Sequence, residues 1–244
     1  MKRSVVLPLL VLFLVGCEAE IKRVEWPVMG TIAALQTRGG SNKLLGELKD
    51  AVENRCYQQI IAEFNAHDPN SQINREGHCS AFGQECEKAA YLLMYQSLCA
   101  FNPQWRDNGK PDFGAIAKGF AVDLACKEAK ALTNRDMLLD LGGNLRSVRG
   151  VWRVGIAGSD LVITLSNDMA CATSAEYFRG KHIYDGRTGQ PVSNNVQSVT
   201  IIHPNSAMLA DGLSTVCFIL GHDEGEEFLK KYYPEAKACW IFKE

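Results

Sequence analysis

The sequence lacks an excess of charge of either sign. It has 26 Lys and Arg residues against 28 Asp and Glu, and the formal net charge at pH 7 is -2. Domains that bind nucleic acid through electrostatics carry a basic face or stripe. The charge balance therefore gives no support to a nucleic-acid partner.

Several motifs that carry a known chemistry are also missing. The chain has no Gly-x-Ser-x-Gly elbow, no Walker A loop and no Gly-x-Gly-x-x-Gly turn after a strand. These patterns mark serine hydrolases, P-loop nucleotide-binding proteins and dinucleotide-binding domains. No two of the nine cysteines form a Cys-x-x-Cys pair, which argues against a structural zinc site and a thioredoxin-like motif.

The cysteines are scattered, and several fall within apolar helical patterns. Cys56, Cys126 and Cys217 are of this kind, as is Cys99. A free cysteine in such a pattern behaves as a small hydrophobe. We therefore predict mostly buried thiols, with Cys79 and Cys86 as the pair to check for a disulfide if the compartment is oxidising.

The N-terminus carries an apolar run, residues 5–15, shorter than the ~20 residues that a membrane-spanning helix needs. It ends in Leu14-Val15-Gly16-Cys17, which resembles the lipobox of bacterial lipoproteins, in which Cys17 would be lipidated. We expect a lipoprotein signal peptide at 1–16. An uncleaved anchor is the alternative, and both would tether the protein outside the cytoplasm.

The chain as a whole has 244 residues and is 46% hydrophobic, which is enough for a sizeable core. We expect a lipidated linker at 17–26 and one domain at 27–244. Periodicity predicts helices and strands that are partly segregated along the chain, which favours an α+β fold. The expected helices are 42–66, 84–99, a helix ending near 132, 206–220 and 223–233. The expected strands lie within 27–37, in 137–148 bent at Gly142-Gly143, and at 151–157, 161–165, 170–173, 181–184, 197–203 and 236–242.

The stretch 112–123 reads as a strand end, a glycine turn and the start of a helix. Gly114 and Gly119 would let the backbone approach a ligand closely. The helix N-terminus suits an anion such as phosphate, and Lys118 could add a point charge. The alternative is an ordinary helix start that happens to contain two glycines.

Asp211 and Thr215 lie four residues apart on an otherwise apolar expected helix, so they share one face. Carboxylate and hydroxyl oxygens are hard donors, suited to Mg²⁺ that keeps waters and a ligand phosphate. The alternative is that Asp211 marks the solvated face near the helix start, where the helix dipole favours a negative charge.

Two further groups could take part in chemistry. His182 is flanked by basic residues and by Asp185, so it could act as a general base or acid, or it could be a surface histidine. Thr173 and Ser174 could donate hydrogen bonds to a ligand, or they could form a turn.

Taken together and in their order, these pieces resemble the ApbE family, the FAD:protein FMN transferases. The matching blocks are Met29-Gly30-Thr31, Asp68-Pro69-Asn70-Ser71, the stretch 112–123, Leu141-Gly142-Gly143-Asn144, Trp152-Arg153-Val154-Gly155-Ile156, Ala172-Thr173-Ser174, the stretch 182–189 and Ala210-Asp211-Gly212-Leu213-Ser214-Thr215.

The resemblance implies a single α+β domain of ApbE-like, T-fold-like architecture that cleaves FAD at its pyrophosphate with the help of Mg²⁺. FMN would be esterified through its phosphate to a Thr or Ser hydroxyl of an acceptor, and AMP would leave. The acceptor would be a flavoprotein subunit of a redox system. The protein would lie on the periplasmic side of a bacterial membrane, anchored by lipid at Cys17.

The resemblance also assigns residues. Asp211 and Thr215 would hold the metal together with a backbone carbonyl, that of Ala115, and Asp211 and His182 would be catalytic, with His182 removing the proton of the acceptor hydroxyl. The FAD site would be lined by Met29, Asn65, His67, Asp112, Lys118, Thr173, Ser174 and Ile183. His67 stands where the family usually has Tyr, and Ser174-Ala175 where it usually has Ser-Gly.

Two other functions are compatible with the same residues. With water as the acceptor, the site would be an FAD pyrophosphatase that gives FMN and AMP. A non-catalytic flavin-binding lipoprotein is the third possibility, because the segment 100–111 is shorter than its counterpart in the family. Covalent attachment of the flavin separates the first function from the second, and turnover with Mg²⁺ separates both from the third.

Overall fold

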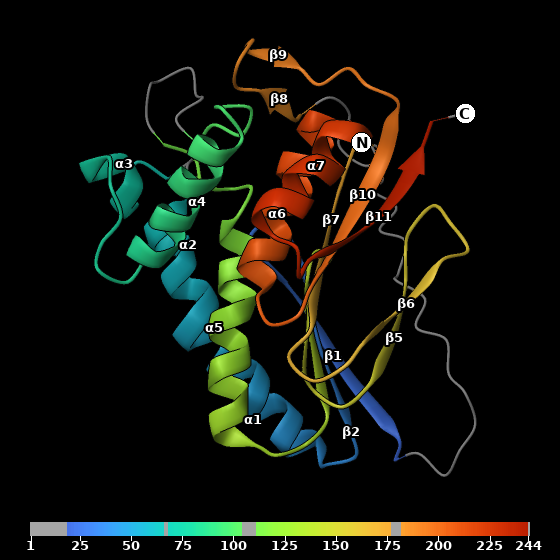
Figure 1. Ribbon diagram of the computed structural model, residues 1–244. Coiled ribbons are helices and arrows are strands. Elements are labelled where there is room, and N and C mark those ends of the chain that lie inside the picture. Colours follow the sequence, from blue (N-terminus) through green and yellow to red (C-terminus); the bar gives the residue numbers. More distant parts are fainter. Residues whose placement is uncertain (1–18, 66–67, 104–110, 177–181, 244) are drawn as a thin grey trace, which may run out of the picture.

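The computed structural model describes residues 19–65, 68–103, 111–176 and 182–243. Its centre is a seven-stranded sheet in the order β1-β2-β3-β4-β7-β10-β11, in which every neighbouring pair is antiparallel (Figure 1). The strands are β1 Ile21–Val28, β2 Thr31–Arg38, β3 Met137–Leu141, β4 Asn144–Arg149, β7 Ala170–Ala175, β10 Val196–His203 and β11 Lys237–Phe242. The expected α+β class is confirmed.

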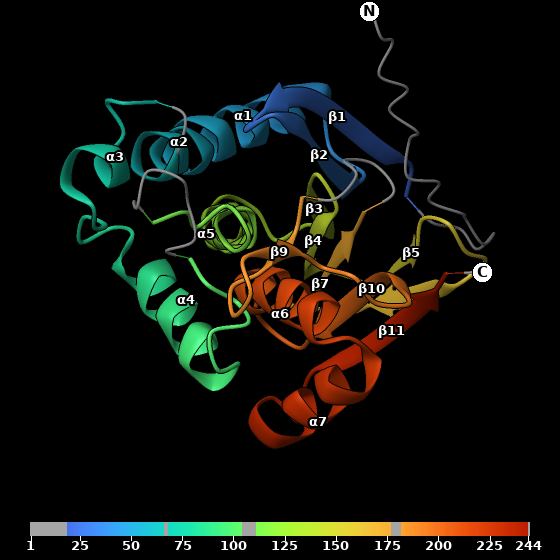
Figure 2. The same ribbon diagram turned by 90° about the horizontal axis from the view of Figure 1, so that it is seen from above.

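The helices gather on one face of this sheet, with α5 and α6 against it and α4 farther out (Figure 2). They are α1 Asn42–Val52, α2 Gln58–Phe64, α3 Gln72–Glu76, α4 Gln84–Gln96, α5 Ala117–Leu132, α6 Ala207–Leu220 and α7 His222–Tyr232. None of the helices in the described residues is long and apolar enough to cross a bilayer.

Two hairpins stand apart from the central sheet. β5 (Trp152–Gly155) and β6 (Val162–Leu165) cover the face that the helices leave open, and β8 (Tyr184–Asp185) and β9 (Gln190–Pro191) lie at the upper end in Figure 1. The sheet is therefore covered by helices on one face and in part by the β5–β6 hairpin on the other, and it has two separate cores.

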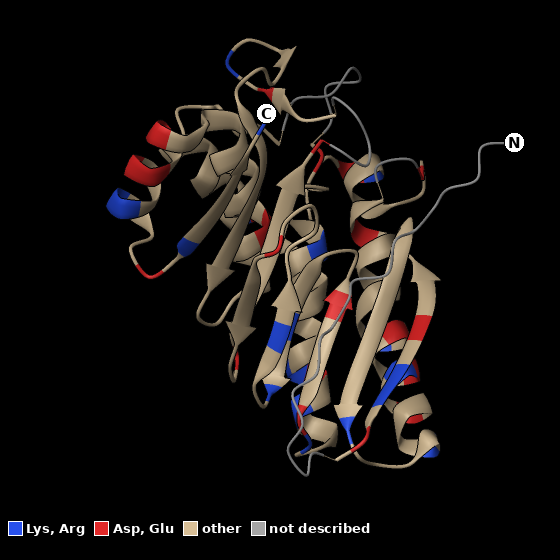
Figure 3. Ribbon diagram, turned by 90° about the vertical axis from the view of Figure 1, so that its right-hand side faces the viewer, with Lys and Arg blue, Asp and Glu red and all other residues tan. Residues whose placement is uncertain are grey.

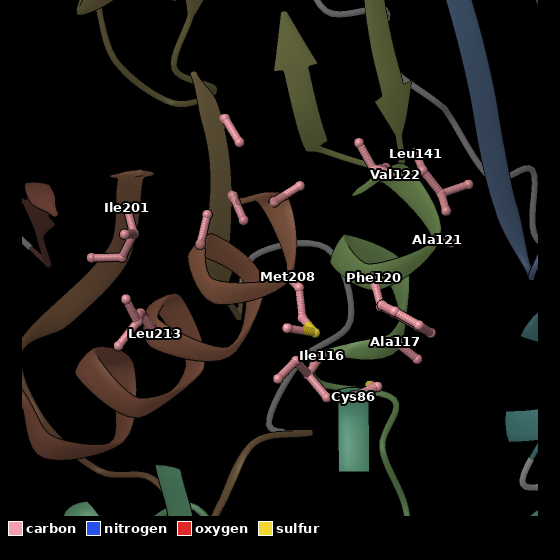
Figure 4. Packing of buried hydrophobic residues seen from close by; sticks show 14 of the residues in the cluster. Cys86, Ile116, Ala117, Phe120, Ala121, Val122, Leu141, Ile201, Met208 and Leu213 are labelled. Carbon is pink, nitrogen blue, oxygen red and sulfur yellow. The ribbon is translucent and has the colours of Figure 1, made fainter. Parts of the chain in front are cut away.

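The larger core lies between the sheet and the helices. Met208 on α6 and Ile116 just before α5 point into the space between the two helices, and Leu213 faces Ile201 on β10 (Figure 4). Phe120 on α5 points away from α6 and packs against Phe64 and Phe82. The smaller core is built by Trp152 and other apolar residues of the β5–β6 hairpin against Leu138, Leu145 and Cys171. Burial of these side chains supplies the main driving force for the layered arrangement.

Most expected elements are confirmed to within a few residues. The helix expected at 42–66 is continuous from α1 to α2 but contains one π-helical segment, Glu53–Tyr57. The bend expected at Gly142-Gly143 is the β3–β4 turn. There Gly142 has a φ of +61°, and a Cβ on it would lie 2.4 Å from Thr31 Oγ1, so the position requires glycine.

The expected linker at 17–26 was wrong from residue 21 onward, because Ile21–Val28 is the first strand of the sheet. Val24, Trp26 and Val28 alternate with exposed Arg23 and Glu25. This period-2 alternation is the signal of a half-buried strand, and the high charge of the segment concealed it.

The strand end expected at residue 112 was also wrong. The structure has a turn at 114–116, and the Asp112 carboxylate accepts a hydrogen bond from Gly114 N at 2.8 Å. This local contact between side chain and backbone offers the chain an alternative to a strand.

Every cysteine in the described residues is a free thiol, so no disulfide joins Cys79 and Cys86. The prediction of mostly buried thiols is confirmed, with Cys99 as an exception. Cys99 is exposed because α4 ends at Gln96, and the chain turns there with a φ of +66° at Cys99 itself.

Asp140 gives this fold a pH dependence that can be measured. It is buried on β3, and burial raises the pKa of its carboxyl from 3.8 to about 6, against the opposing hydrogen bond from Gly143 N. The folded chain thus binds the proton more tightly than the unfolded chain, so the free energy of unfolding falls as the pH rises from 3.8 to about 6.

We expect Asp140→Asn to raise the free energy of unfolding at pH 7 by about 1–3 kcal/mol, because the amide oxygen can still accept from Gly143 and no charge is buried. Urea unfolding of both proteins between pH 4 and 8 would measure this, and the two curves should converge near pH 4. A variant that is less stable than the wild type at pH 7 would contradict the assignment.

Candidate active site

The candidate site is built where α5 and α6 cross at unusually close range. A Cβ placed on Gly119 of α5 would lie 2.2 Å from the Ala207 carbonyl oxygen and 2.7 Å from the Asp211 Cβ on α6. Real side chains do not approach backbone atoms this closely, so only glycine fits. The crossing fixes the first turn of α5 beside the first turn of α6.

This crossing holds Asp211 in a buried position. Its Oδ2 accepts a hydrogen bond from Gly119 N at 2.9 Å and lies 3.9 Å from Lys118 Nζ. Burial raises the pKa of the Asp211 carboxyl, and the Lys118 charge and the Gly119 N–H oppose the rise. Asp211 is only 6% exposed, so the alternative of a solvated helix face was wrong.

Two oxygens at this crossing are left available. Within the described part of the chain, no group donates a hydrogen bond to Asp211 Oδ1 or to the Ala115 carbonyl. The Ala115 carbonyl would normally accept from Gly119 N, four residues on, but that N–H turns to Asp211. A buried crossing with spare hard oxygens is suited to a cation.

Thr215 lies one turn after Asp211, and hydroxyl contacts join it to the sheet. Ser174 Oγ on β7 lies 2.8 Å from Ser214 Oγ and 3.3 Å from Thr215 Oγ1, and Ser214 Oγ donates to the Asp211 carbonyl at 2.9 Å. The structure therefore brings together four of the residues that the sequence pointed to: Lys118, Ser174, Asp211 and Thr215.

The sequence analysis did not give a role to Asp123, which binds the start of α6 together with the N-cap residue, Ser206. Its carboxylate accepts hydrogen bonds from Ser206 Oγ (2.9 Å), Ala207 N (2.7 Å) and Met208 N (3.0 Å), and it pairs with Arg146 at 2.5 Å. An Asp from another helix thus caps α6 and complements its dipole. The available signal was the spacing of four residues from Gly119, which places both on one face of α5.

The strand register places Met29 and Thr173 at the same end of the sheet as this cluster. Met29 lies in the β1–β2 turn, with a φ of +51°, and packs partly buried against the main core. Thr173 is exposed, and its hydroxyl lies 2.7 Å from that of Thr200. Both remain predicted FAD contacts.

Other predicted residues lie on neighbouring segments, and no contact between described residues joins them to Asp211. The Asn65 carbonyl accepts from Ser71 Oγ (2.8 Å) and Asn74 Nδ2 (3.1 Å), which fixes the turn after α2. Ile183 is buried, while His182 before it is exposed. Asp112 holds its own turn, as described above. His67 and Cys17 lie outside the described residues.

The oxygen atoms at the crossing suit a hard divalent cation that also keeps water molecules or ligand oxygens in its coordination shell. The described residues contain no cluster of three or more His, Cys, Asp or Glu side chains that could hold a metal alone. One carboxylate, one hydroxyl and one carbonyl instead suit Mg²⁺, which typically retains waters and binds through one or two carboxylates plus ligand phosphates. Lys118 would add positive charge on the same side.

The structure thus defines an α+β domain with a seven-stranded antiparallel sheet and a buried acidic site between two crossed helices. The family model described as "ApbE family" matches residues 83–240, which include both helices and the site. The chain belongs to the ApbE family.

Similar proteins agree with this assignment. The chain is 33% identical over 141 residues to an FAD:protein FMN transferase of Haemophilus influenzae, and the match covers 49% of this chain and 40% of that protein. The chain is also 34% identical over 158 residues to an FAD:protein FMN transferase of Treponema pallidum, and this match covers 54% of this chain and 43% of that protein. The matched region is therefore less than half the length of these relatives.

The fold is shared over almost the whole chain. The apo form of the Pseudomonas stutzeri flavinyl transferase ApbE superimposes with a TM-score of 0.76 at 22% identity, covering 93% of this chain and 92% of that one. At this coverage, most of the region before residue 83 also belongs to the common architecture.

The helix crossing can be tested with one methyl group. We expect Gly119→Ala to lower the free energy of unfolding by about 2–3 kcal/mol, because the added Cβ overlaps the backbone of α6, which cannot move aside as a side chain would. Thermal or urea unfolding would measure it.

Gly46→Ala is the matched control. Gly46 lies within α1, and nothing lies within 4 Å of an added Cβ there, so the change should stabilise the chain by about 1 kcal/mol through helix propensity. Similar effects of the two substitutions would contradict the close crossing.

Asp211 can be tested for cation binding without any assay of activity. Asp211→Asn removes a buried charge and keeps an acceptor for Gly119 N, so we expect the free energy of unfolding at pH 7 to rise or to stay unchanged. We also expect Mg²⁺ or Mn²⁺ binding, measured by calorimetry with an ADP probe, to fall at least about tenfold. A variant that binds the ion like the wild type would show that Asp211 is not a ligand.

Proposed function

We propose that this chain is a Mg²⁺-dependent FAD:protein FMN transferase. The observation that carries the proposal is the pair of spare oxygens at the α5–α6 crossing, Asp211 Oδ1 and the Ala115 carbonyl, with the Thr215 hydroxyl one turn away. The identity to FAD:protein FMN transferases supports it.

In this proposal Asp211, Thr215 and Ala115 hold the cation. When bound, Mg²⁺ would stabilise the negative charge that grows on the pyrophosphate of FAD as its P–O bond breaks. Lys118, whose ammonium lies 3.9 Å from Asp211, would neutralise a further part of that charge. Because the site is largely buried, each of these charges acts more strongly than it would in water.

The flavin would lie along the end of the sheet. The β1–β2 and β3–β4 turns meet there, where Thr31 lies directly against Gly142, and Met29 packs beside them. Thr173 and Ser174 at the end of β7 could donate hydrogen bonds to the ligand, and Asp112, Asn65, His67 and Ile183 would line the remaining site. A flat ring suits an apolar, glycine-lined surface with a few polar groups.

The transfer step joins the acceptor to FMN. A Thr or Ser hydroxyl oxygen of the acceptor attacks the phosphorus of the FMN half, the bond to the AMP phosphate breaks, and AMP leaves. His182 takes the proton of the hydroxyl. It lies in an exposed position two residues before β8, and an exposed base can reach a hydroxyl on a second protein.

The cellular location of the protein is part of the proposal. The Leu14-Val15-Gly16-Cys17 tetrad supports lipidation at Cys17 and anchoring on the periplasmic side of a bacterial membrane. The acceptor would be a flavoprotein subunit of a redox system in the same compartment.

The test combines the purified protein with FAD, Mg²⁺ and a candidate periplasmic flavoprotein, and follows in-gel flavin fluorescence and AMP release. We expect a fluorescent acceptor band and one AMP per labelled acceptor. His182→Ala should slow transfer by about 10²–10⁴-fold and leave the affinity for FAD unchanged. His222→Ala, on α7 outside the site, is the matched control and should transfer at the wild-type rate.

Different outcomes identify the rival functions. AMP release without any labelled acceptor, with several acceptors tried, would indicate an FAD pyrophosphatase that uses water. FAD binding with neither product would indicate a flavin-binding lipoprotein. Equal losses of FAD affinity and transfer in His182→Ala would make His182 a binding residue.

A further inference from the structure

The molecule has a second distinctive surface at the end opposite the candidate site. The first strand begins there, α5 ends there, and β3 begins and β4 ends there (Figure 1). We call it the tether end. Its members are the basic residues Lys22, Arg38, Arg135 and Arg149 and the apolar residues Leu132 and Val151.

Contacts between segments far apart in the sequence hold this surface together. Arg38 donates to the Val151 carbonyl at 2.7 Å, and Arg149 donates to the Thr133 carbonyl at 3.0 Å. A Cβ placed on Gly39 would lie 3.2 Å from the Arg135 guanidinium and 3.6 Å from the Ala19 Cβ. The first described residues of the chain thus lie at the tether end.

The tether end carries an excess of positive charge. Arg38 pairs with Asp136 at 3.1 Å, but Lys22, Arg135 and Arg149 form no ion pair with any described residue. Glu20 and Asp136 are the carboxylates among these same segments. Blue segments gather at the lower ends of the strands in Figure 3.

The same surface exposes two large apolar side chains. Leu132 at the end of α5 is 46% exposed, and Val151 before β5 is 54% exposed. Basic side chains next to exposed aliphatic ones are the composition of surfaces that bind to the headgroup region of a bilayer.

We propose that the tether end rests on an anionic membrane surface. The choice of a membrane as the partner follows from the short link between Cys17 and β1. It rests on the lipidation of Cys17 in the proposed function. Only Glu18, Ala19 and Glu20 separate Cys17 from Ile21, so even a fully extended tether spans at most about 14 Å. So short a tether keeps the start of β1 close to the headgroups, where Lys22 and Arg135 meet the lipid phosphates.

This orientation determines where the acceptor must be. α5 runs from the candidate site at Lys118 and Gly119 to the tether end at Leu132, so the two are about 20 Å apart. The site then faces away from the bilayer. The hydroxyl that receives FMN must lie on a segment that projects to about this height, and not at the membrane surface.

The test uses the lipidated full-length protein in nanodiscs of phosphatidylcholine with and without 30% phosphatidylglycerol. Amide hydrogen exchange should show protection of residues 131–136 and 149–152 on the anionic discs only, and no change at 112–119. The protection should weaken as salt is added, because surface charges are screened.

The charge-reversed variant Lys22→Glu with Arg135→Glu should lose this protection at least about tenfold. Lys230→Glu with Lys231→Glu, exposed on α7, is the matched control and should retain it. Unfolding curves of both variants show whether they fold, since a folded variant without protection supports the proposal. Protection that persists in the tether-end variant, or that is equal on both kinds of disc, would overturn it.

Two further outcomes would also overturn the proposal. Mass spectrometry that shows no lipid on Cys17 removes its basis. Slower FMN transfer by the tether-end variant in detergent, without any membrane, would assign the surface to the acceptor protein. FAD cleavage in detergent is measured separately, so failure of the flavin chemistry is distinguishable from failure of membrane docking.

Discussion

The close crossing of α5 and α6 is the constraint on which the rest of the site depends. Gly119 brings the two backbones together, and its N–H turns to Asp211. That single hydrogen bond has two consequences: it fixes one oxygen of a buried carboxylate, and it leaves the Ala115 carbonyl without its helical donor. A helix start with one missing internal hydrogen bond thereby becomes a place for a cation.

Two aspartates on these helices show how environment decides the role of a residue. Asp123 accepts three hydrogen bonds at the start of α6 and pairs with Arg146, so its charge is fully compensated. Asp211 has one backbone hydrogen bond and a lysine 3.9 Å away, so its charge is compensated only in part. The first stabilises the packing of α6 on α5, and the second has an oxygen to spare for a ligand.

The arrangement of the two cores gives the molecule a rigid sheet with distinct ends. Helices cover one face and the β5–β6 hairpin covers part of the other, so the ends of the strands are what remains accessible. At one end lie the turns with Met29 and Gly142, Ser174 near the end of β7, and the helix crossing. At the other end lie Arg135, Leu132 and the start of the chain. The candidate active site and the tether end therefore lie near opposite ends of α5.

Much of this could be predicted from residue patterns. The 3.6-residue periodicity located α1, α4 and α6, and Gly142-Gly143 marked the β3–β4 turn. The spacing of Asp211 and Thr215 placed them on one helical face, and the ordered blocks indicated the ApbE family. The alternation in β1 was present as well, but charged residues on its exposed face made it look like a linker.

The remaining features depend on contacts between distant parts of the chain. Whether Asp211 faced solvent or a buried crossing was undecided in the sequence, because a helical wheel does not show which helix covers a face. The α6 groups that Asp123 binds lie more than eighty residues along the chain, so only packing reveals the cap. The sequence by itself determined the elements and the kind of chemistry, since both follow from local spacing. Tertiary structure decided which oxygens are free, because that depends on which backbone groups lie within hydrogen-bonding distance in space.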